Sequence, residues 1–252
     1  LPCPLQDKSV AVSSLTGSAD AFLAATCAMR DPKPRVVLAV TPGLPEADRL
    51  ADDLQILTAR TACRILAFPP LLEDDRGTLG ARLKALAALR AWDILPCPLI
   101  LAAGFPALAA PVPRHAVATL TLSVSAPGSQ SMFSAVKEKL FGLGYNRVPL
   151  VEKEGDWSVR GGIIDAWSPG EEFPVRLEYF GEDLESVRLF DCATQRSIRT
   201  ANEAVLVPVE LKASDEKVPL FSLLPEGSVV LALEHNAYTL PPEAAPYPTV
   251  FT

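Results

Sequence analysis

The residues with the clearest chemical meaning lie between Trp157 and Asp191, in the stretch WSVRGGIIDAWSPGEEFPVRLEYFGEDLESVRLFD. Side chains alternate along a strand, so Arg176, Glu178 and Phe180 share one face of the run VRLEYF while the residues between them share the other. An arginine and an aromatic ring exposed together are residue types that dominate binding hot spots. This stretch therefore predicts a surface that binds another protein.

Three carboxylates in the same region, Asp165, Glu178 and Asp191, allow a second interpretation, namely an acid–base cluster. Charged residues in strands usually face solvent, and we interpret these three as ion-pair partners of the neighbouring arginines. The chain has two histidines and no C-x-x-C pair, so the spacing of a metal site is absent. We expect no catalytic residue, no metal and no cofactor.

A second candidate for chemistry is the turn Thr16-Gly17-Ser18, between a short apolar run and an alanine-rich helical segment. Strand, glycine turn and helix form the layout of a phosphate-binding loop, which also needs a second glycine and a lysine that reaches the phosphates. The sequence LTGSADAFLAAT has neither, and Asp20 would repel a nucleotide. The turn is therefore predicted to be a degenerate nucleotide loop that serves as a plain connection.

The first part of the chain alternates apolar strands with helices, with strands expected over 35–40, 65–68 and 94–102 and helices over 45–57 and 78–92. This alternation favours a parallel α/β sheet. Farther on, three runs rich in β-branched and aromatic residues are separated by Ser168-Pro169-Gly170 and Gly181-Glu182-Asp183, which favours an antiparallel meander.

A helix is expected before the meander, because Phe133, Val136 and Leu140 recur at helical spacing. Ser129 or Ser131 is expected to cap its first turn. The glycines at 142 and 144 are expected to end it.

Charge and composition exclude several classes of protein. A net charge of -7 and a pI near 5.0 argue against a dedicated nucleic-acid binder, since such proteins neutralise phosphates with cations. Five scattered cysteines are typical of a reducing cytoplasm, which is the expected location. The most apolar stretch, 94–112, is interrupted by prolines and is a poor membrane helix, so no membrane contact is expected.

The segments FGLGYNRV, GDWSVRGGIIDAW, VRLEYFGEDLESVRLFD and VLVP, from about Phe141 to Pro208, resemble the second domain of the excision-repair protein family of UvrB. They are still more similar to the equivalent domain near the N-terminus of bacterial transcription-repair coupling factors. The resemblance implies a surface that contacts UvrA. Arg160 matches the arginine of the family's VRGG motif, and Arg176 and Phe180 match its RLxFF-like motif, so these three are the implied UvrA-binding residues.

The beginning of the chain distinguishes the two relatives. UvrB is expected to carry an intact nucleotide loop and an aromatic-rich hairpin that grips DNA, but Phe68 is the sole aromatic residue between Leu66 and Thr78. The favoured function is the non-catalytic N-terminal region of a coupling factor that recruits UvrA, with RNA polymerase and DNA bound only through domains absent from this chain. The alternative is a UvrB-type ATP-dependent enzyme of DNA damage recognition, or a fragment of one.

In the family's terms the chain has three parts. Residues 1–115 are expected to form a degenerate RecA-like, UvrB-like α/β module with a parallel sheet. Residues 116–208 are expected to form an inserted α+β domain, built on an antiparallel sheet, that binds UvrA. Residues 209–252 are expected to return to the first module with a core strand over 228–233. The proline-rich tail, 240–252, lacks periodicity and is expected to be disordered or to mark a place where a longer protein was cut.

Overall fold

The computed structural model describes residues 9–12, 17–29, 33–72, 75–94, 96–114, 119–125, 128–210 and 216–252. The chain divides into two compact units. Unit 1 comprises Leu1–Leu72, Ala85–Ala116 and Glu216–Thr252, and unit 2 comprises Glu73–Lys84 and Val117–Asp215. The division into residues 1–115, 116–208 and 209–252 that the sequence suggests stays a prediction.

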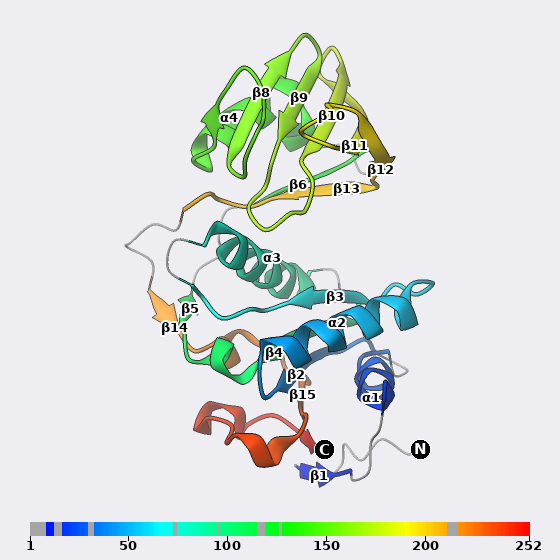
Figure 1. Cartoon of the computed structure of the whole chain (residues 1–252), viewed down its shortest axis with the longest axis vertical. Coiled ribbons are helices and arrows are strands. Elements are labelled where there is room, and N and C mark those ends of the chain that lie inside the picture. The colour runs from blue at the N-terminus through cyan, green and yellow to red at the C-terminus, as the bar shows by residue number, and fades with distance from the viewer. Residues whose placement is uncertain are drawn as a thin grey trace. The chain divides into compact units, whose positions relative to one another are not determined.

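Unit 1 is built on a six-stranded parallel sheet (Figure 1). Its strands, in sheet order, are β1 (Ser9–Ala11), β16 (Thr249–Phe251), β15 (Val229–Ala232), β2 (Val36–Thr41), β4 (Leu99–Gly104) and β3 (Arg64–Ala67). All neighbouring pairs run parallel. The central strands read VVLAVT and LILAAG and are buried along their whole length, because strands of a parallel sheet are enclosed on both faces.

Helices alternate with these strands, as the sequence predicted. They are α1 (Ala19–Ala28), α2 (Leu44–Thr58) and α3 (Arg76–Trp92). In α2, Pro45 occupies the first turn, where its missing N–H costs no hydrogen bond. Apolar residues of α1 and α2 form one core cluster with β2, β4 and β15, including Ala24, Leu54 and Ile100. The α/β class with a parallel sheet is confirmed.

The end of the chain differs from the expectation of a disordered tail. Residues Thr249–Phe251 form β16, which lies between β1 and β15 in the sheet and pairs with both. Val250 is buried in the core cluster of unit 1. A strand of three residues is too short to produce a periodic pattern, so the expectation of disorder was wrong.

The remaining elements of unit 1 are short. They are the 3-10 helices η1 (Phe105–Leu108), η3 (Leu220–Leu223), η4 (His235–Ala237) and η5 (Pro242–Ala244), and the strands β5 (Val112–Pro113) and β14 (Lys217–Val218). The pair β5–β14 is antiparallel and joins the segment that leaves unit 1 to the segment that returns to it.

Unit 2 contains a second six-stranded sheet. Its strands, in sheet order, are β12 (Ser197–Thr200), β11 (Asp183–Phe190), β10 (Val175–Phe180), β9 (Ile163–Ala166), β8 (Asp156–Arg160) and β7 (Asn146–Arg147). Neighbours from β8 to β12 are antiparallel, and only β7 runs parallel to its partner β8. The predicted meander is confirmed. A separate antiparallel ribbon consists of β6 (Leu120–Ser123) and β13 (Glu203–Leu206).

One face of this sheet is the core of unit 2. The helix α4 (Phe133–Gly142) packs on it, and Val136, Leu140, Ile164 and Leu177 belong to one buried cluster (Figure 1). Buried and less buried residues alternate along β10, so the two-residue period sorts this strand into a core face and an outer face. Tyr179 is on the core face, as predicted, with its ring edge-on to Phe133.

The start of α4 differs from the prediction. A short 3-10 turn, η2 (Ser129–Ser131), comes first, and the N-cap is Met132, which has no capping side chain. The carboxylate of Glu182, in the β10–β11 turn, accepts hydrogen bonds from the Ser134 backbone N–H at 2.9 Å and from its hydroxyl at 2.8 Å. A side chain from another element therefore caps this helix, and the expected serine caps were wrong. The helix ends at Gly142, followed by Gly144 with a φ of 82°, as predicted.

The first turns of α3 belong to unit 2, because they contact the loop between β9 and β10. A Cβ atom on Gly80 would stand 2.0 Å from the carbonyl oxygen of Pro169, so only glycine permits this approach. Lys84 donates a hydrogen bond to the Gly170 carbonyl at 2.9 Å and pairs with Glu171 at 2.6 Å. These contacts explain why Glu73–Lys84 group with a domain that lies far away in sequence.

Candidate protein-binding surface

The outer face of the β8–β11 sheet is the candidate site. Cross-strand pairing places Asp165, Arg176 and Arg188 in one row across β9, β10 and β11. The next row contains Arg160, paired with Ile163, and Glu178, which pairs with the same isoleucine. We call this surface, with Phe180 at the end of β10, the outer face. It gathers the three residues predicted from the sequence: Arg160, Arg176 and Phe180.

Asp165 is the centre of the outer face. Its carboxylate is 1% exposed and accepts hydrogen bonds from Nε and Nη2 of Arg176 at 2.8 and 2.9 Å. A third bond, at 2.7 Å, comes from Nη2 of Arg160. The predicted ion pairing of Asp165 is confirmed, and it involves both arginines at once. A bidentate arginine–carboxylate pair of this kind is strong and directional.

The two arginines differ in exposure. The Arg176 side chain is 12% exposed, and its guanidinium lies 4.5 Å from the ring centroid of the buried Phe190. The hydrogen bond to Asp165 raises the pKa of Arg176 above its ordinary value, so the residue stays charged. The Arg160 side chain is 47% exposed. Arg160 therefore presents its charge to solvent, whereas Arg176 is mostly engaged within the domain.

The turn between β11 and β12 closes over the arginines through Gln195. The Arg176 Nη1 donates to the Gln195 backbone carbonyl at 3.2 Å, and the Arg160 Nη2 lies 3.4 Å from the Gln195 side-chain oxygen. The Gln195 amide donates in turn to the Cys192 carbonyl at 2.7 Å. Gln195 has a φ of 61°, a conformation that is uncommon for residues other than glycine. No sequence signal pointed to Gln195.

The other two predicted carboxylates have different roles. Glu178 pairs with Arg188 at 3.2 Å and accepts a hydrogen bond from the hydroxyl of Ser186, as predicted for an ion-pair partner. Asp191 instead accepts hydrogen bonds from the backbone N–H and hydroxyl of Thr194 at 2.7 and 2.9 Å. Its prediction as an arginine partner was wrong, because it lies beyond the last β10–β11 pair and stabilises the following turn.

Phe180 is the exposed apolar group of the outer face. It is 77% exposed at the end of β10, where Gly181 begins the turn to β11 with a φ of 63°. The neighbouring hairpin at the same end of the sheet, between β8 and β9, places Gly161-Gly162 directly after Arg160, with a φ of 59° at Gly161. Two glycine-containing turns thus frame the aromatic ring and the half-exposed arginine. The predicted arrangement of Arg176, Glu178 and Phe180 on one face is present.

Gly17, in the turn that resembles a nucleotide loop, lies near the carboxyl ends of β2 and β15, where it shares a cavity with Thr41 and Leu233. Thr16 is outside the described residues, and Ser18 is the N-cap of α1 without a capping side chain. Beside Gly17 is a cavity of about 20 Å³, which has room for little more than one water molecule. Its charged lining residues are Asp20, Glu46, Arg49, Asp53 and Glu234. Burial, and then the nearby Glu234, raise the pKa of Asp20, so the cavity is poorly suited to anions.

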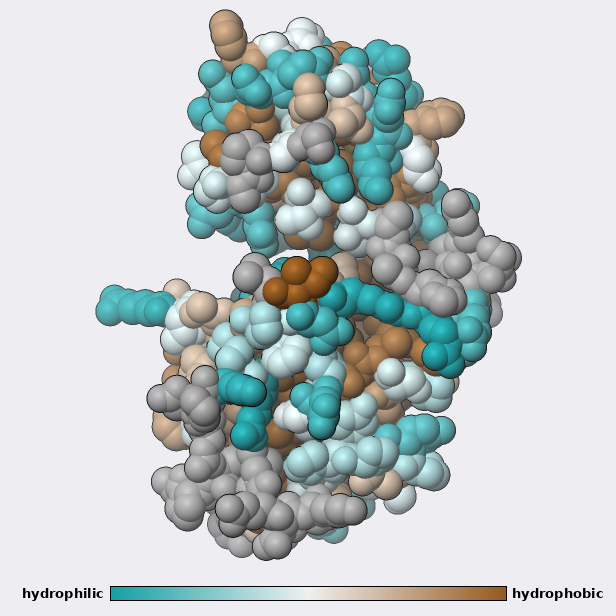
Figure 2. Space-filling model, turned by 180° about the vertical axis from the view of Figure 1, so that it is seen from behind, coloured by the Kyte–Doolittle hydropathy of each residue, from teal (hydrophilic) through white to brown (hydrophobic). Residues whose placement is uncertain are grey.

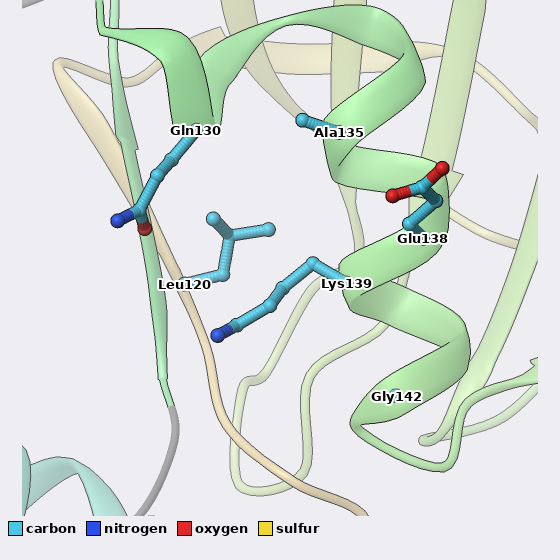
Figure 3. Close-up of a pocket in the computed structure, with 6 residues that line it drawn as sticks. All are labelled: Leu120, Gln130, Ala135, Glu138, Lys139 and Gly142. Atoms are coloured by element: carbon cyan, nitrogen blue, oxygen red, sulfur yellow. The ribbon is translucent and has the colours of Figure 1, made fainter.

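A larger groove of about 320 Å³ lies beside α4 in unit 2 (Figure 3). Figure 3 shows Leu120 between the side chains of Gln130 and Lys139, with Ala135, Glu138 and Gly142 along the helix. The groove combines an apolar floor with a few polar side chains, and these lining residues include no nucleophile–base pair. The groove gives no indication of catalysis.

The described residues contain no group of three histidine, cysteine or carboxylate side chains that could hold a metal ion. Over the same residues, no helix is both long and apolar enough to cross a membrane. Cys27, Cys63, Cys97 and Cys192 are free thiols. Figure 2 shows the molecule from the side opposite to Figure 1. On this face of unit 2, hydrophilic side chains predominate and apolar ones are interspersed among them.

Sequence comparisons agree with the geometry of unit 2. Residues 125–211 match the family model described as "UvrB interaction domain". This segment is therefore similar to UvrB interaction domains. It contains α4, the whole meander and the outer face, so the resemblance drawn from VRGGIIDAW and RLEYFGEDLESVRLFD is confirmed.

Curated relatives identify the wider family. The transcription-repair-coupling factor of Myxococcus xanthus is 43% identical over 34% of this chain and 7% of its own length. That of Mycobacterium bovis is 34% identical over 64% of this chain and 14% of its own length. That of Escherichia coli is 26% identical over 81% of this chain and 18% of its own length. The chain is thus related to transcription-repair-coupling factors and spans less than a fifth of the length of these relatives.

Proposed function

We propose that the chain is the N-terminal, non-catalytic region of a transcription-repair coupling factor and recruits UvrA through the outer face of its UvrB interaction domain. The observation that carries this proposal is the exposed Phe180 on the same face as the half-exposed Arg160. Both match motif positions of the family, as does Arg176. Exposed aromatic and arginine side chains are the usual anchors of protein interfaces.

The charge of the outer face favours an acidic partner surface. In the ion-paired cluster around Asp165, three arginines, Arg160, Arg176 and Arg188, accompany two carboxylates, Asp165 and Glu178, which leaves one positive charge in excess. Asp183, opposite Phe180, lies outside this cluster at the edge of the sheet. The chain as a whole carries -7. A local positive excess on an acidic protein supports recognition of carboxylates, since complementary charges fix orientation and partner choice.

The cavity beside Gly17 supports a non-enzymatic function over the ATP-dependent alternative. A nucleotide loop needs N–H groups and a lysine around the phosphates, whereas this cavity is small and four of its five charged lining residues are carboxylates. We infer that neither ATP nor magnesium binds there. Binding of RNA polymerase and DNA is proposed only for complete relatives, through regions outside this chain.

The proposed compartment is the cytoplasm. It is supported by the four described cysteines, which are free, since secreted domains of similar size commonly use disulfides.

Direct binding to purified UvrA, measured by titration calorimetry with the full chain, tests the proposal. We expect a saturable complex that UvrB displaces, because the matching residues imply one shared site. A complex that holds UvrB and this chain on the same UvrA protomer contradicts the shared site, and a titration without binding contradicts the function. A parallel ATP titration with magnesium should show no binding, and micromolar affinity would restore the enzyme hypothesis.

A further inference from the structure

The two arginines of the outer face have unequal freedom. The Arg176 guanidinium uses Nε, Nη1 and Nη2 within the domain and lies over Phe190. Arg160 is bound only through Nη2, and its Nε and Nη1 have no hydrogen-bond partner in the described part of the chain. Arg160 therefore has free N–H donors at the surface, where a carboxylate of a partner can accept them.

We infer that Asp165 is a positioning residue, which fixes Arg160 for contact with a carboxylate of the partner. Gln195 is the second residue that holds Arg160 in place. This inference rests on the proposed function, because it assigns roles within the same surface. Arg176 then acts mainly through Asp165: its bidentate bonds hold the buried carboxylate in the orientation that receives Arg160.

The physical reason lies in the cost of ordering a long side chain. A free arginine loses much rotamer freedom when a partner immobilises it. Here the 2.7 Å bond to Asp165 and the contact with the Gln195 side-chain oxygen restrict Arg160 before binding. A preorganised side chain raises affinity because less entropy is lost in the complex. Gln195 is itself held by its bond to the Cys192 carbonyl.

The charge of Asp165 and its position beside Arg160 predict opposite effects of the variant Asp165→Asn on the affinity for UvrA. Removal of a negative charge from a face that meets carboxylates should strengthen binding if long-range attraction dominates. Loss of the ionic anchor for Arg160 should weaken it. We expect a loss of roughly 30-fold or more in affinity for UvrA, the range of a hot-spot residue. Glu138→Gln is the matched control, since it removes an equal charge from an exposed position of α4, which packs on the other face of the sheet, and it should not weaken binding.

A double-mutant cycle separates positioning from general damage to the fold. If Asp165 acts through Arg160, the double variant Asp165→Asn/Arg160→Ala should bind no more weakly than Arg160→Ala alone. Because Asp165→Asn leaves Arg176 nearly buried without a counter-ion, a second variant, Asp165→Asn/Arg176→Gln, neutralises both partners. It should fold and bind as weakly as Arg160→Ala. Additive losses in the first cycle, at matched stability, would overturn the inference.

A readout without UvrA keeps this inference separate from the proposed function. The ¹⁵N relaxation of the Arg160 Nε in the free chain should report an ordered guanidinium, and the Asp165→Asn variant should make it mobile. Unchanged order in the variant refutes the positioning role. If wild-type chain fails to bind UvrA while Arg160 loses order as expected, the proposed function fails and the positioning geometry stands.

Discussion

Gly162 and Tyr179 approach each other so closely that a Cβ atom on the glycine would stand 2.6 Å from the Tyr179 carbonyl oxygen. The Tyr179 N–H also donates to the Gly162 carbonyl at 2.8 Å. This contact joins the β8–β9 hairpin, which carries Arg160, to the strand that carries Phe180. The second glycine of the VRGG motif is thus explained by space rather than by a turn conformation.

The substitution Gly162→Ala should therefore lower the free energy of unfolding by about 1–3 kcal/mol, the usual cost of overpacking. Urea titration followed by tryptophan fluorescence measures it, because Trp157 and Trp167 lie in unit 2. Gly142→Ala is the control: a Cβ there meets no atom within 4 Å, and stability should change by less than about 1 kcal/mol. Equal stability of the two variants would show that the hairpin yields at no cost.

Much of the outer face could be predicted because its signals are local. The two-residue period of VRLEYF sorts Arg176, Glu178 and Phe180 onto one face, and glycine-containing turns mark both hairpins. Neither signal depends on distant residues. The resemblance to the family's motifs then suggests UvrA as the partner, which the alternation of side chains alone cannot identify.

The rest depends on contacts between distant segments. Gln195 reaches Arg160 across 35 residues of sequence, and Glu182 caps α4 at Ser134 across 48 residues. Nothing in a local pattern marks either residue, since glutamine and glutamate in turns normally face solvent. The closeness of Gly80 to Pro169 has the same origin, and it could not be anticipated from a glycine inside a helix.

Truncation of Phe180 tests the surface itself. We expect Phe180→Ala to weaken UvrA binding by about 2 kcal/mol or more if the ring is a central anchor, while stability changes by less than about 0.5 kcal/mol because the ring lies outside the core. Phe141→Ala is the matched control, since Phe141 is 80% exposed on α4, away from the outer face. Normal binding by Phe180→Ala would remove the aromatic ring from the site.

The cap of α4 should make unit 2 sensitive to acid. Hydrogen bonds from the Ser134 N–H and hydroxyl lower the pKa of Glu182 below its ordinary 4.5. A lowered pKa in the folded state stabilises the fold above pH 4.5, and this contribution disappears as pH falls through the lower folded value. Wild type should therefore be more stable than Glu182→Gln near neutral pH and equal to it in strong acid. Glu185→Gln, at a neighbouring exposed position, is the control that removes one charge and leaves the cap intact.

The acidic cavity in unit 1 leads to the opposite pH dependence. Burial and Glu234 raise the pKa of Asp20 above its ordinary 3.8, so the folded chain binds a proton there more readily than the unfolded chain. The ionised carboxylate consequently destabilises unit 1 at neutral pH. Replacement Asp20→Asn should raise the urea midpoint at pH 7, and the gain should shrink as pH falls through the raised pKa towards 3.8.

Asp52→Asn is the matched control for this measurement, because Asp52 is exposed on α2 and does not line the cavity. It removes the same charge from unit 1 and should leave the urea midpoint at pH 7 nearly unchanged. A stabilising effect of Asp20→Asn that is independent of pH would point to packing rather than charge. A destabilising effect at pH 7 would mean that Arg49, whose charge lowers the pKa of Asp20, outweighs burial, and the cavity would then be a paired site rather than an acidic one.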